Sequence, residues 1–225
     1  MTFSDIASSI DHTNLKAEAK TEDIVQLCNE AIDYQFAAVC IHPCHVSLCS
    51  KLLRDTQVGI CTVVGFPLGV NTTETKVAET LQAIKSGATE IDLVINVGKV
   101  KDGDDDYFKE ELVKIRAACG SLVCLKVILE MSALNDSEKR RCAQMSIDVG
   151  VDYLKTSTGT HKLGGATVPD AELLMSMVDG NQVKVKAAGG IRELSTIVEH
   201  LNLGVDRIGT SSGISIIKEF KDATH

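Results

Sequence analysis

The sequence predicts an α/β fold, a single (β/α)8 barrel with a short N-terminal helical extension. Short apolar runs alternate with amphipathic stretches along the whole chain, as expected for strands that alternate with helices. The alternation produces eight strand–helix units in 225 residues, slightly below the size of about 250 residues that is typical of such barrels. No Pro-, Ser- or Gly-rich linker divides the chain, so residues 1–225 are expected to form one domain.

The elements can be placed in order along the chain. Strands are expected near 9–13, 37–42, 59–65, 90–97, 122–130, 152–157, 184–189 and 206–211. Helices are expected near 21–35, 43–54, 72–86, 105–118, 136–149, 168–179 and 193–203, with a last one from about 213. Thr72 or Thr73 can cap one helix that ends at Gly87, Asn135 begins a capping box, and Pro169 fits a first helical turn. A doubly wound open sheet is the rival fold, but its usual GxGxxG fingerprint is absent, as is a GxxxxGK[ST] phosphate loop.

Composition narrows the class of function. The net charge of −8 argues against nucleic acid or an anionic membrane surface as the main partner, while a small anionic ligand needs only a local positive site. No apolar run approaches the roughly 18 residues of a membrane span. Eight cysteines without an export signal at "MTFSDIASSIDHTNL" indicate reduced thiols, and we expect a cytoplasmic protein.

Polar side chains recur on one face of four predicted strands. They are Glu90, Asp92 and Asn96 in "EIDLVINVG", Lys126 and Glu130 in "LVCLKVILE", Lys155 in "DYLKTS" and Lys186 in "KVKAAGG". Strands of a parallel barrel are covered on both faces and are usually apolar throughout. We therefore expect these side chains to point into the barrel, most of them near its C-terminal end, where barrel enzymes keep their active sites.

A buried pair of lysines suits amine chemistry. The amine of Lys155 must be neutral to attack a carbonyl, and the pKa of a free lysine is about 10.4. Lys186 on the next strand would disfavour the charged form, and Asp92 could accept and return protons. This combination indicates Schiff-base catalysis. The alternative is a structural ion network of Lys155, Lys126, Asp92 and Glu130, because buried charges are normally paired.

Glycine-rich segments follow the last three predicted strands. They read "STGT", "AAGGIR" and "GTSSGI", and the third contains Ser211 and Ser212. Backbone N–H groups at helix N-termini bind phosphate, and the common phosphate site of barrels lies after strands seven and eight. The segments therefore predict a phosphate-binding end of the site.

A second cluster, "CIHPCHVSLC", offers zinc ligands. Its members are Cys40, His42, Cys44, His45 and Cys49. The spacing does not match a zinc site, because only His45 and Cys49 would share a helix face and no second pair completes the set. We expect no metal, and instead a strand–helix junction with buried thiols, where Cys40 faces the site.

Taken together, these motifs resemble the deoxyribose-phosphate aldolase family over almost the whole chain. The resemblance runs through "IDHTNL", "CIHP", "VVGFPLG", "TKVAET", "GATEIDLVINVG", "KVILE", "DYLKTSTG", "KAAGGIR" and "RIGTSSG". It implies a (β/α)8 barrel that works as a class I aldolase without metal or other cofactor. Such enzymes split 2-deoxy-D-ribose 5-phosphate reversibly into acetaldehyde and D-glyceraldehyde 3-phosphate, a step in deoxyribose phosphate catabolism.

The resemblance also implies roles for individual residues. Lys155 would form the Schiff base, Lys186 would lower its pKa, and Asp92 would relay protons with weaker support from Asp11. The phosphate would contact Gly159, Gly189, Gly190, Ser211 and Ser212. Thr160 departs from the pattern, since some members carry a phosphate-contacting lysine there, and "EFKDATH" holds no C-terminal tyrosine.

Two other functions stay open at this level. One is a class I aldolase for a different phosphosugar, and the other is a non-catalytic barrel that binds sugar phosphates through structural lysines. The expected partner is a small phosphosugar rather than nucleic acid or membrane. A homo-oligomer is compatible with the sequence, which does not define the oligomeric state.

Overall fold

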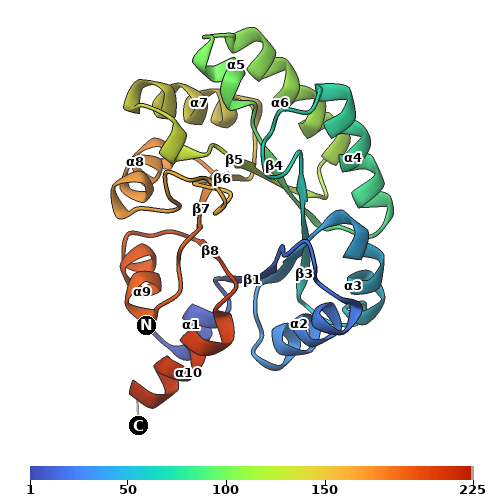
Figure 1. The fold of residues 1–225 in the computed structure, drawn as a ribbon. Coiled ribbons are helices and arrows are strands. Elements are labelled where there is room, and N and C mark those ends of the chain that lie inside the picture. The colour runs from blue at the N-terminus through green and yellow to red at the C-terminus, as the bar shows by residue number, and fades with distance from the viewer. Residues whose placement is uncertain (224–225) are drawn as a thin grey trace.

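The computed structural model describes residues 1–223, which form a closed barrel of eight parallel strands surrounded by helices (Figure 1). The strands are β1 (Ile10–Asn14), β2 (Ala38–Ile41), β3 (Gly59–Val64), β4 (Glu90–Val94), β5 (Cys124–Ile128), β6 (Tyr153–Lys155), β7 (Lys184–Ala188) and β8 (Arg207–Thr210). Each strand pairs with the next in the chain, and β1 closes the ring against β8, with Asp11 opposite Gly209. The predicted (β/α)8 barrel is therefore confirmed.

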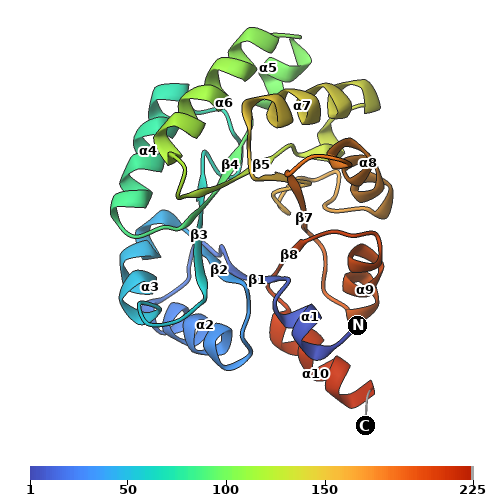
Figure 2. The same ribbon diagram turned by 180° about the vertical axis from the view of Figure 1, so that it is seen from behind.

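The helices cover the outside of the barrel. They are α1 (Phe3–Ala7), α2 (Thr21–Asp33), η1 (Pro43–His45), α3 (Val46–Leu52), α4 (Thr73–Lys85), α5 (Val97–Lys101), α6 (Asp105–Cys119), η2 (Met131–Ala133), α7 (Asp136–Val149), α8 (Val168–Val178), α9 (Leu194–Asn202) and α10 (Gly213–Ala223). The caps expected from the sequence are present: Thr72 accepts from the N–H of Thr75, and Asn135 forms a capping box with Glu138. The N-terminal extension is α1, which lies against α10 (Figure 2). No helix within residues 1–223 has the length and apolar character to cross a membrane.

Two of the strands that end earlier than the sequence predicts had been expected to carry inward polar residues at their ends. β4 stops at Val94, because the side chain of Asn96 accepts a hydrogen bond from the N–H of Lys99 and starts α5. β5 stops at Ile128, and Glu130 takes a left-handed backbone conformation with φ of 52°. The placement of Asn96 and Glu130 on inward faces of these strands is therefore wrong.

The interior of the barrel is divided into two regions. On β2 and β3 it is lined by the small apolar side chains of Ala38, Cys40, Cys61 and Val63. On β4 to β8 and on β1 it carries charged side chains instead, which are described below. Outside the strands, one continuous apolar core packs the helices against the barrel. The charged region therefore lies inside a rigid, closed sheet.

A buried ion pair outside the barrel supports the end of β4. Lys76 of α4 donates to the carbonyl of Val94 (2.9 Å) and to the carboxylate of Glu111 on α6 (2.8 Å). The two charged side chains are 0% and 1% exposed. Because β4 carries Asp92, this pair anchors a strand of the charged region.

Removing one member of this pair should strongly destabilise the protein. We expect Lys76→Met to lower the free energy of unfolding by about 3–5 kcal/mol, because Glu111 would stay buried without a cation. Lys114→Met is the control, since Lys114 pairs with Glu110 at the surface, and a helical pair of that kind contributes only about 0.3–0.5 kcal/mol. Urea unfolding measures both variants, and equal losses would contradict the assigned role of Lys76.

Candidate active site

Three lysines surround one buried carboxylate in the barrel. Asp92 accepts from Lys155 and Lys186 at the same oxygen, Oδ2, at 2.7 Å each, and from Lys126 at Oδ1 at 3.1 Å. The strand register explains the cluster, because Asp92 lies opposite Lys126, and Lys155 lies opposite Lys186. All four side chains are at most 4% exposed. The structure thus brings together the three residues that the sequence predicts for catalysis.

Asp11 is the second carboxylate of the cluster, and Arg207 is a member that sequence reasoning missed. Asp11 accepts from Lys186 and from Arg207, at 2.5 Å each. Arg207 also reaches Glu90 at 3.5 Å, and Glu90 accepts a short hydrogen bond from Lys126. The signal for Arg207 was its position two residues before Gly209 on β8, which places both on the inward face.

Gly209 leaves room for this arrangement. A Cβ atom at position 209 would lie 3.2 Å from Cε of Lys186 and 2.9 Å from Cβ of Ala188. Any larger residue would therefore push against the side chain of Lys186. The glycine in "RIGTSSG" is required by this close approach, in addition to any role in the turn that follows.

The surrounding charges determine the ionisation of the carboxylates. Burial alone would raise the pKa of Asp92, but the three lysines outweigh it and hold that pKa well below its usual range. Burial opposes ionisation of Asp11 too, but Lys186 and Arg207 lower its pKa to about 2. Conversely, the neighbouring carboxylates overcome the effect of burial on Lys186 and raise its pKa. Asp11, Asp92 and Lys186 are therefore charged at neutral pH.

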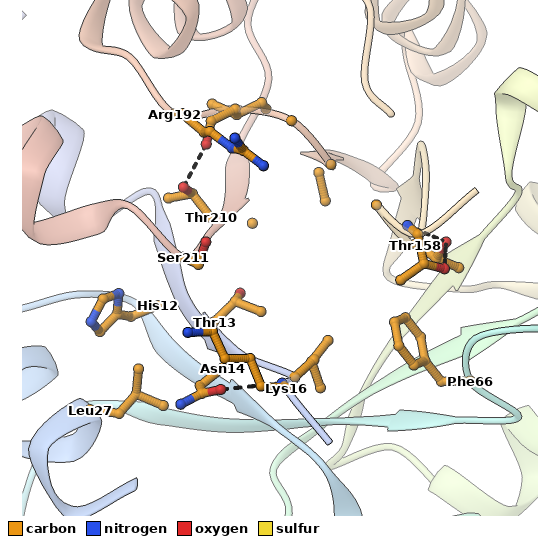
Figure 3. A pocket seen from close by; sticks show the side chains of 18 of the residues that line it. His12, Thr13, Asn14, Lys16, Leu27, Phe66, Thr158, Arg192, Thr210 and Ser211 are labelled. Carbon is orange, nitrogen blue, oxygen red and sulfur yellow. Dashed lines mark hydrogen bonds between the residues drawn. The ribbon is translucent and has the colours of Figure 1, made fainter. Parts of the chain in front are cut away.

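A pocket opens at the carboxyl ends of the strands, with a cavity volume of about 430 Å³. Lys155 lines it, whereas Asp92, Lys186 and Asp11 lie beneath the surface. Figure 3 shows Arg192, Thr210 and Ser211 on one side of the pocket and Phe66 and Thr158 on the other. Lys155 is thus the only lysine of the buried cluster that faces the pocket.

Four of the five predicted phosphate residues line this pocket. Gly159, Gly189, Gly190 and Ser211 line it. Ser212 is outside the lining set, and its N–H donates to Thr210 Oγ1 (2.9 Å). The exposed side chain of Arg192, which sequence reasoning missed although it follows "AAGGI", brings a cation to the same pocket.

Two of these glycines bring loops into direct backbone contact. A Cβ atom on Gly159 would lie 3.0 Å from Cα of Gly189, and both residues have positive φ, 82° and 95°. Only glycine combines this backbone conformation with such a close approach. The wall of the pocket therefore consists of backbone where the loops after β6 and β7 meet.

His12 was also missed and lines the pocket from β1. Its Nε2 lies 2.7 Å from Glu30 Oε2 on α2, and its Nδ1 has no hydrogen-bond partner within residues 1–223. Burial lowers the pKa of His12, although Glu30 partly opposes this effect. The ring contributes a neutral wall to the pocket at physiological pH.

The cysteine–histidine cluster is dispersed in the structure. Cys40 lies inside the barrel, Cys49 contacts Cys28 between helices at 3.6 Å, and His42 bonds to the carbonyl of Leu15. Within residues 1–223, the sulfur and carboxylate atoms that lie close enough together to hold a metal ion are grouped around Cys61, beside Asp92 and other acidic side chains. Lys126 donates to the same sulfur (3.4 Å) and to Asp92, so an ammonium group already occupies this position.

The fold and the pocket define a (β/α)8-barrel protein with a charged site at the carboxyl ends of its strands. The chain belongs to the DeoC/LacD family aldolases, which it matches over residues 6–218. It is 48% identical to a deoxyribose-phosphate aldolase of Caldanaerobacter subterraneus subsp. tengcongensis, over 96% of this chain and 94% of that protein. A deoxyribose-phosphate aldolase of Geobacillus sp. is 46% identical, over 95% of each chain.

Solved structures agree with this assignment. The deoxyribose phosphate aldolase of Aeropyrum pernix, described as having a unique tetrameric structure, superposes with a TM-score of 0.91 at 33% identity, over 99% of this chain and 93% of that one. An aldolase called QR15 also gives a TM-score of 0.91, at 38% identity, over 98% of this chain and 97% of that one. The family membership predicted from the motifs is confirmed.

The lowered pKa of Asp11 predicts a loss of stability in acid. A carboxylate whose pKa falls from about 3.8 to about 2 on folding stabilises the protein above pH 3.8, and this contribution disappears as the pH falls toward 2. We expect the difference in unfolding free energy between wild type and Asp11→Asn to shrink by about 2 kcal/mol over that range. Urea unfolding at successive pH values measures it, and a constant difference would contradict the charged state of Asp11.

Proposed function

We propose that this chain cleaves 2-deoxy-D-ribose 5-phosphate reversibly to acetaldehyde and D-glyceraldehyde 3-phosphate through a Schiff base on Lys155. The observation that carries the proposal is the position of Lys155, whose amine bonds to Asp92 and also lines the pocket. The relatives named deoxyribose-phosphate aldolase, matched over nearly their full length, support the choice of substrate. The reaction belongs to the breakdown of deoxyribose phosphate in the cytoplasm.

The proposed reaction begins with attack of the neutral Lys155 amine on C1 of the open-chain aldehyde. Loss of water leaves an iminium, whose positive nitrogen accepts electrons. The C3 hydroxyl gives its proton to the relay at Asp92, the C2–C3 bond breaks, and its electron pair forms an enamine. Glyceraldehyde 3-phosphate leaves at this step. Protonation at C2 and hydrolysis then release acetaldehyde and restore the amine.

The basic and acidic groups inside the barrel are unequal in number. Four basic groups meet three carboxylates there, so one positive charge is in excess when all are ionised. The groups are Lys126, Lys155, Lys186 and Arg207 against Asp11, Glu90 and Asp92. With Lys155 neutral, the remaining cations and carboxylates are equal in number. Lys155 is also the member that a pocket-bound aldehyde can reach.

The neighbours of Lys155 take supporting roles in this proposal. Lys186 supplies a fixed positive charge that disfavours a second cation beside it, and Asp92 exchanges protons with the substrate. Asp11 holds Lys186 in place from beneath, together with Arg207. No metal or organic cofactor enters the proposed reaction.

The phosphate is proposed to bind at the glycine wall. That wall is lined by backbone groups of Gly159, Gly189 and Gly190 and by the hydroxyl of Ser211. Ser212, the next residue of the same loop, stays part of the proposed phosphate site. Thr160 carries no charge, so Arg192 supplies the cation that some relatives provide at position 160. The partner is therefore a small phosphosugar. A homo-oligomer is proposed by analogy with the tetrameric relative, and light scattering tests it.

Covalent trapping tests the proposed chemistry. Borohydride reduction in the presence of deoxyribose 5-phosphate or acetaldehyde should inactivate the protein, add the aldehyde carbons to Lys155 in peptide mass maps, and be unaffected by EDTA. Lys155→Met should abolish trapping and lower cleavage by several orders of magnitude, because no covalent route is left. Lys184→Met, at an exposed lysine on the neighbouring strand, is the matched control and should keep both borohydride trapping and cleavage activity.

Two results would reject the proposal in different ways. No adduct on Lys155 would favour a non-catalytic sugar-phosphate barrel. An adduct formed more efficiently with another phosphosugar would favour a different class I aldolase.

The role of Lys186 is tested by pH dependence. Removing its charge in Lys186→Leu should make a cation at position 155 easier to form, so the acidic limb of the trapping-rate profile should move to higher pH. Part of the activity should survive, in contrast to Lys155→Met. Trapping rates are the cleaner measurement, because Lys186 also contacts the proton relay at Asp92. An unmoved limb would exclude like-charge tuning by Lys186.

A further inference from the structure

Glu130 is a buried carboxylate that the proposed reaction does not use. It follows β5, is 4% exposed, and has φ of 52° and ψ of 56°, which places it in the left-handed region. Residues other than glycine rarely adopt this conformation, and such strain is found preferentially at functional sites. No basic side chain within residues 1–223 forms an ion pair with Glu130.

The carboxylate of Glu130 instead accepts hydrogen bonds from one residue, Thr158, in the loop after β6. The hydroxyl of Thr158 donates to Glu130 Oε2 at 2.5 Å, and the N–H of Thr158 lies 3.4 Å from both carboxylate oxygens. Thr158 therefore bonds to Glu130 through both its side chain and its backbone. The strained backbone at Glu130 is thus coupled to Thr158.

The direction of this bond determines the next one. Because the hydrogen of Thr158 Oγ1 points to Glu130, its oxygen accepts from the groups on the other side. The N–H of Thr160 donates to it at 3.2 Å, and the hydroxyl of Thr160 lies 3.0 Å away. Glu130, Thr158 and Thr160 therefore form a hydrogen-bonded relay that folds the loop back on itself.

This relay shapes the wall of the pocket. Thr158, Gly159 and Thr160 all line the cavity, whereas Glu130 does not (Figure 3 shows Thr158 at its edge). Gly159 lies between the two threonines and is in backbone contact with Gly189. Any displacement of Thr158 therefore moves both glycine segments that face the proposed phosphate position.

We propose that Glu130 is a positioning residue for phosphate recognition, acting through Thr158 to hold the backbone of residues 158–160 against Gly189. The proposal rests on the proposed function, in which this wall binds the substrate phosphate. It also gives Thr160 a part: its hydroxyl and N–H complete the relay at the position where some relatives present a lysine. Residues 158–160 then contribute oriented backbone to recognition, while the cation comes from Arg192.

Thr158→Val tests the relay with almost no change in volume. The variant removes both the donor to Glu130 and the acceptor for Thr160. We expect about tenfold weaker binding of inorganic phosphate by calorimetry and an increase of about tenfold in KM for deoxyribose 5-phosphate, a change of about 1.4 kcal/mol in binding free energy. KM for unphosphorylated deoxyribose and the rate of borohydride trapping with acetaldehyde should stay within about twofold.

Glu130→Gln should have the same selective effect, because its amide NH₂ would face the N–H of Thr158. The double variant should bind phosphate no more weakly than Thr158→Val, since the two residues act as a unit. Glu138→Gln, a carboxylate-to-amide change in the capping box of α7, is the matched control. Ser211→Glu is the reference for a variant that loses phosphate binding by repulsion.

Several results would overturn the proposal. These are unchanged phosphate binding in Thr158→Val, equal KM increases for phosphorylated and unphosphorylated substrates, additive losses in the double variant, and absence of phosphate binding by wild type. If Glu130→Gln does not fold, as judged by circular dichroism, Thr158→Val decides alone. The wild type could bind phosphate and yet neither cleave deoxyribose 5-phosphate nor form an adduct. That result would reject the proposed function. The phosphate affinities of the variants would still decide the role of Glu130.

Discussion

The barrel depends on one carboxylate, Asp92, and the three lysine side chains that surround it. Neither partner would be stable alone in this position, because an isolated buried charge is strongly unfavourable. Three lysines side by side would repel one another, and a carboxylate without them would take up a proton. The carboxylate and the lysines therefore offset the cost of burying one another, and the closed sheet holds them at hydrogen-bond distance. The other carboxylates, Asp11 and Glu90, extend the same balance to Arg207.

Lys126, Lys155 and Asp92, from the ion network that was the alternative to catalysis, lie in one cluster, whereas Glu130 lies outside it and bonds to Thr158. Lys126 and Lys186 are fully buried and bonded on several sides, so they are structural in the ordinary sense. Lys155 bonds within the set only to Asp92 and faces the pocket. In the proposed function, the structural cluster therefore also holds the nucleophile, and Lys155 is the member with the fewest bonds inside the cluster.

Periodicity in the sequence was sufficient to find the centre of the site. Charged residues alternating with apolar ones in strands that should be apolar throughout pointed to Asp92, Lys155 and Lys186, because a covered sheet leaves such residues only the barrel interior. Arg207 has a similar periodic position on β8, but its bond to Asp11 joins residues at opposite ends of the chain, and alternation alone does not identify that partner.

The errors arose where strands end. Asn96 and Glu130 continue the alternation of their strands but leave the sheet, one by capping a helix and the other by a left-handed turn. Local hydrogen bonds decide such endings, and they depend on groups that come together only in the folded chain. Ser212 shows the same limitation, because its N–H turns toward Thr210 instead of lining the pocket.

The contact between Gly159 and Gly189 limits how this pocket can evolve or be redesigned. Where two backbones touch, no side chain lies between them that substitution could enlarge, shrink or recharge. Changes in the accepted substrate must therefore come from positions where side chains line the cavity, such as Leu15, Phe66, Thr160 and Arg192. The part of the wall made by the two glycines is fixed by main-chain geometry, and adaptation is confined to these side chains.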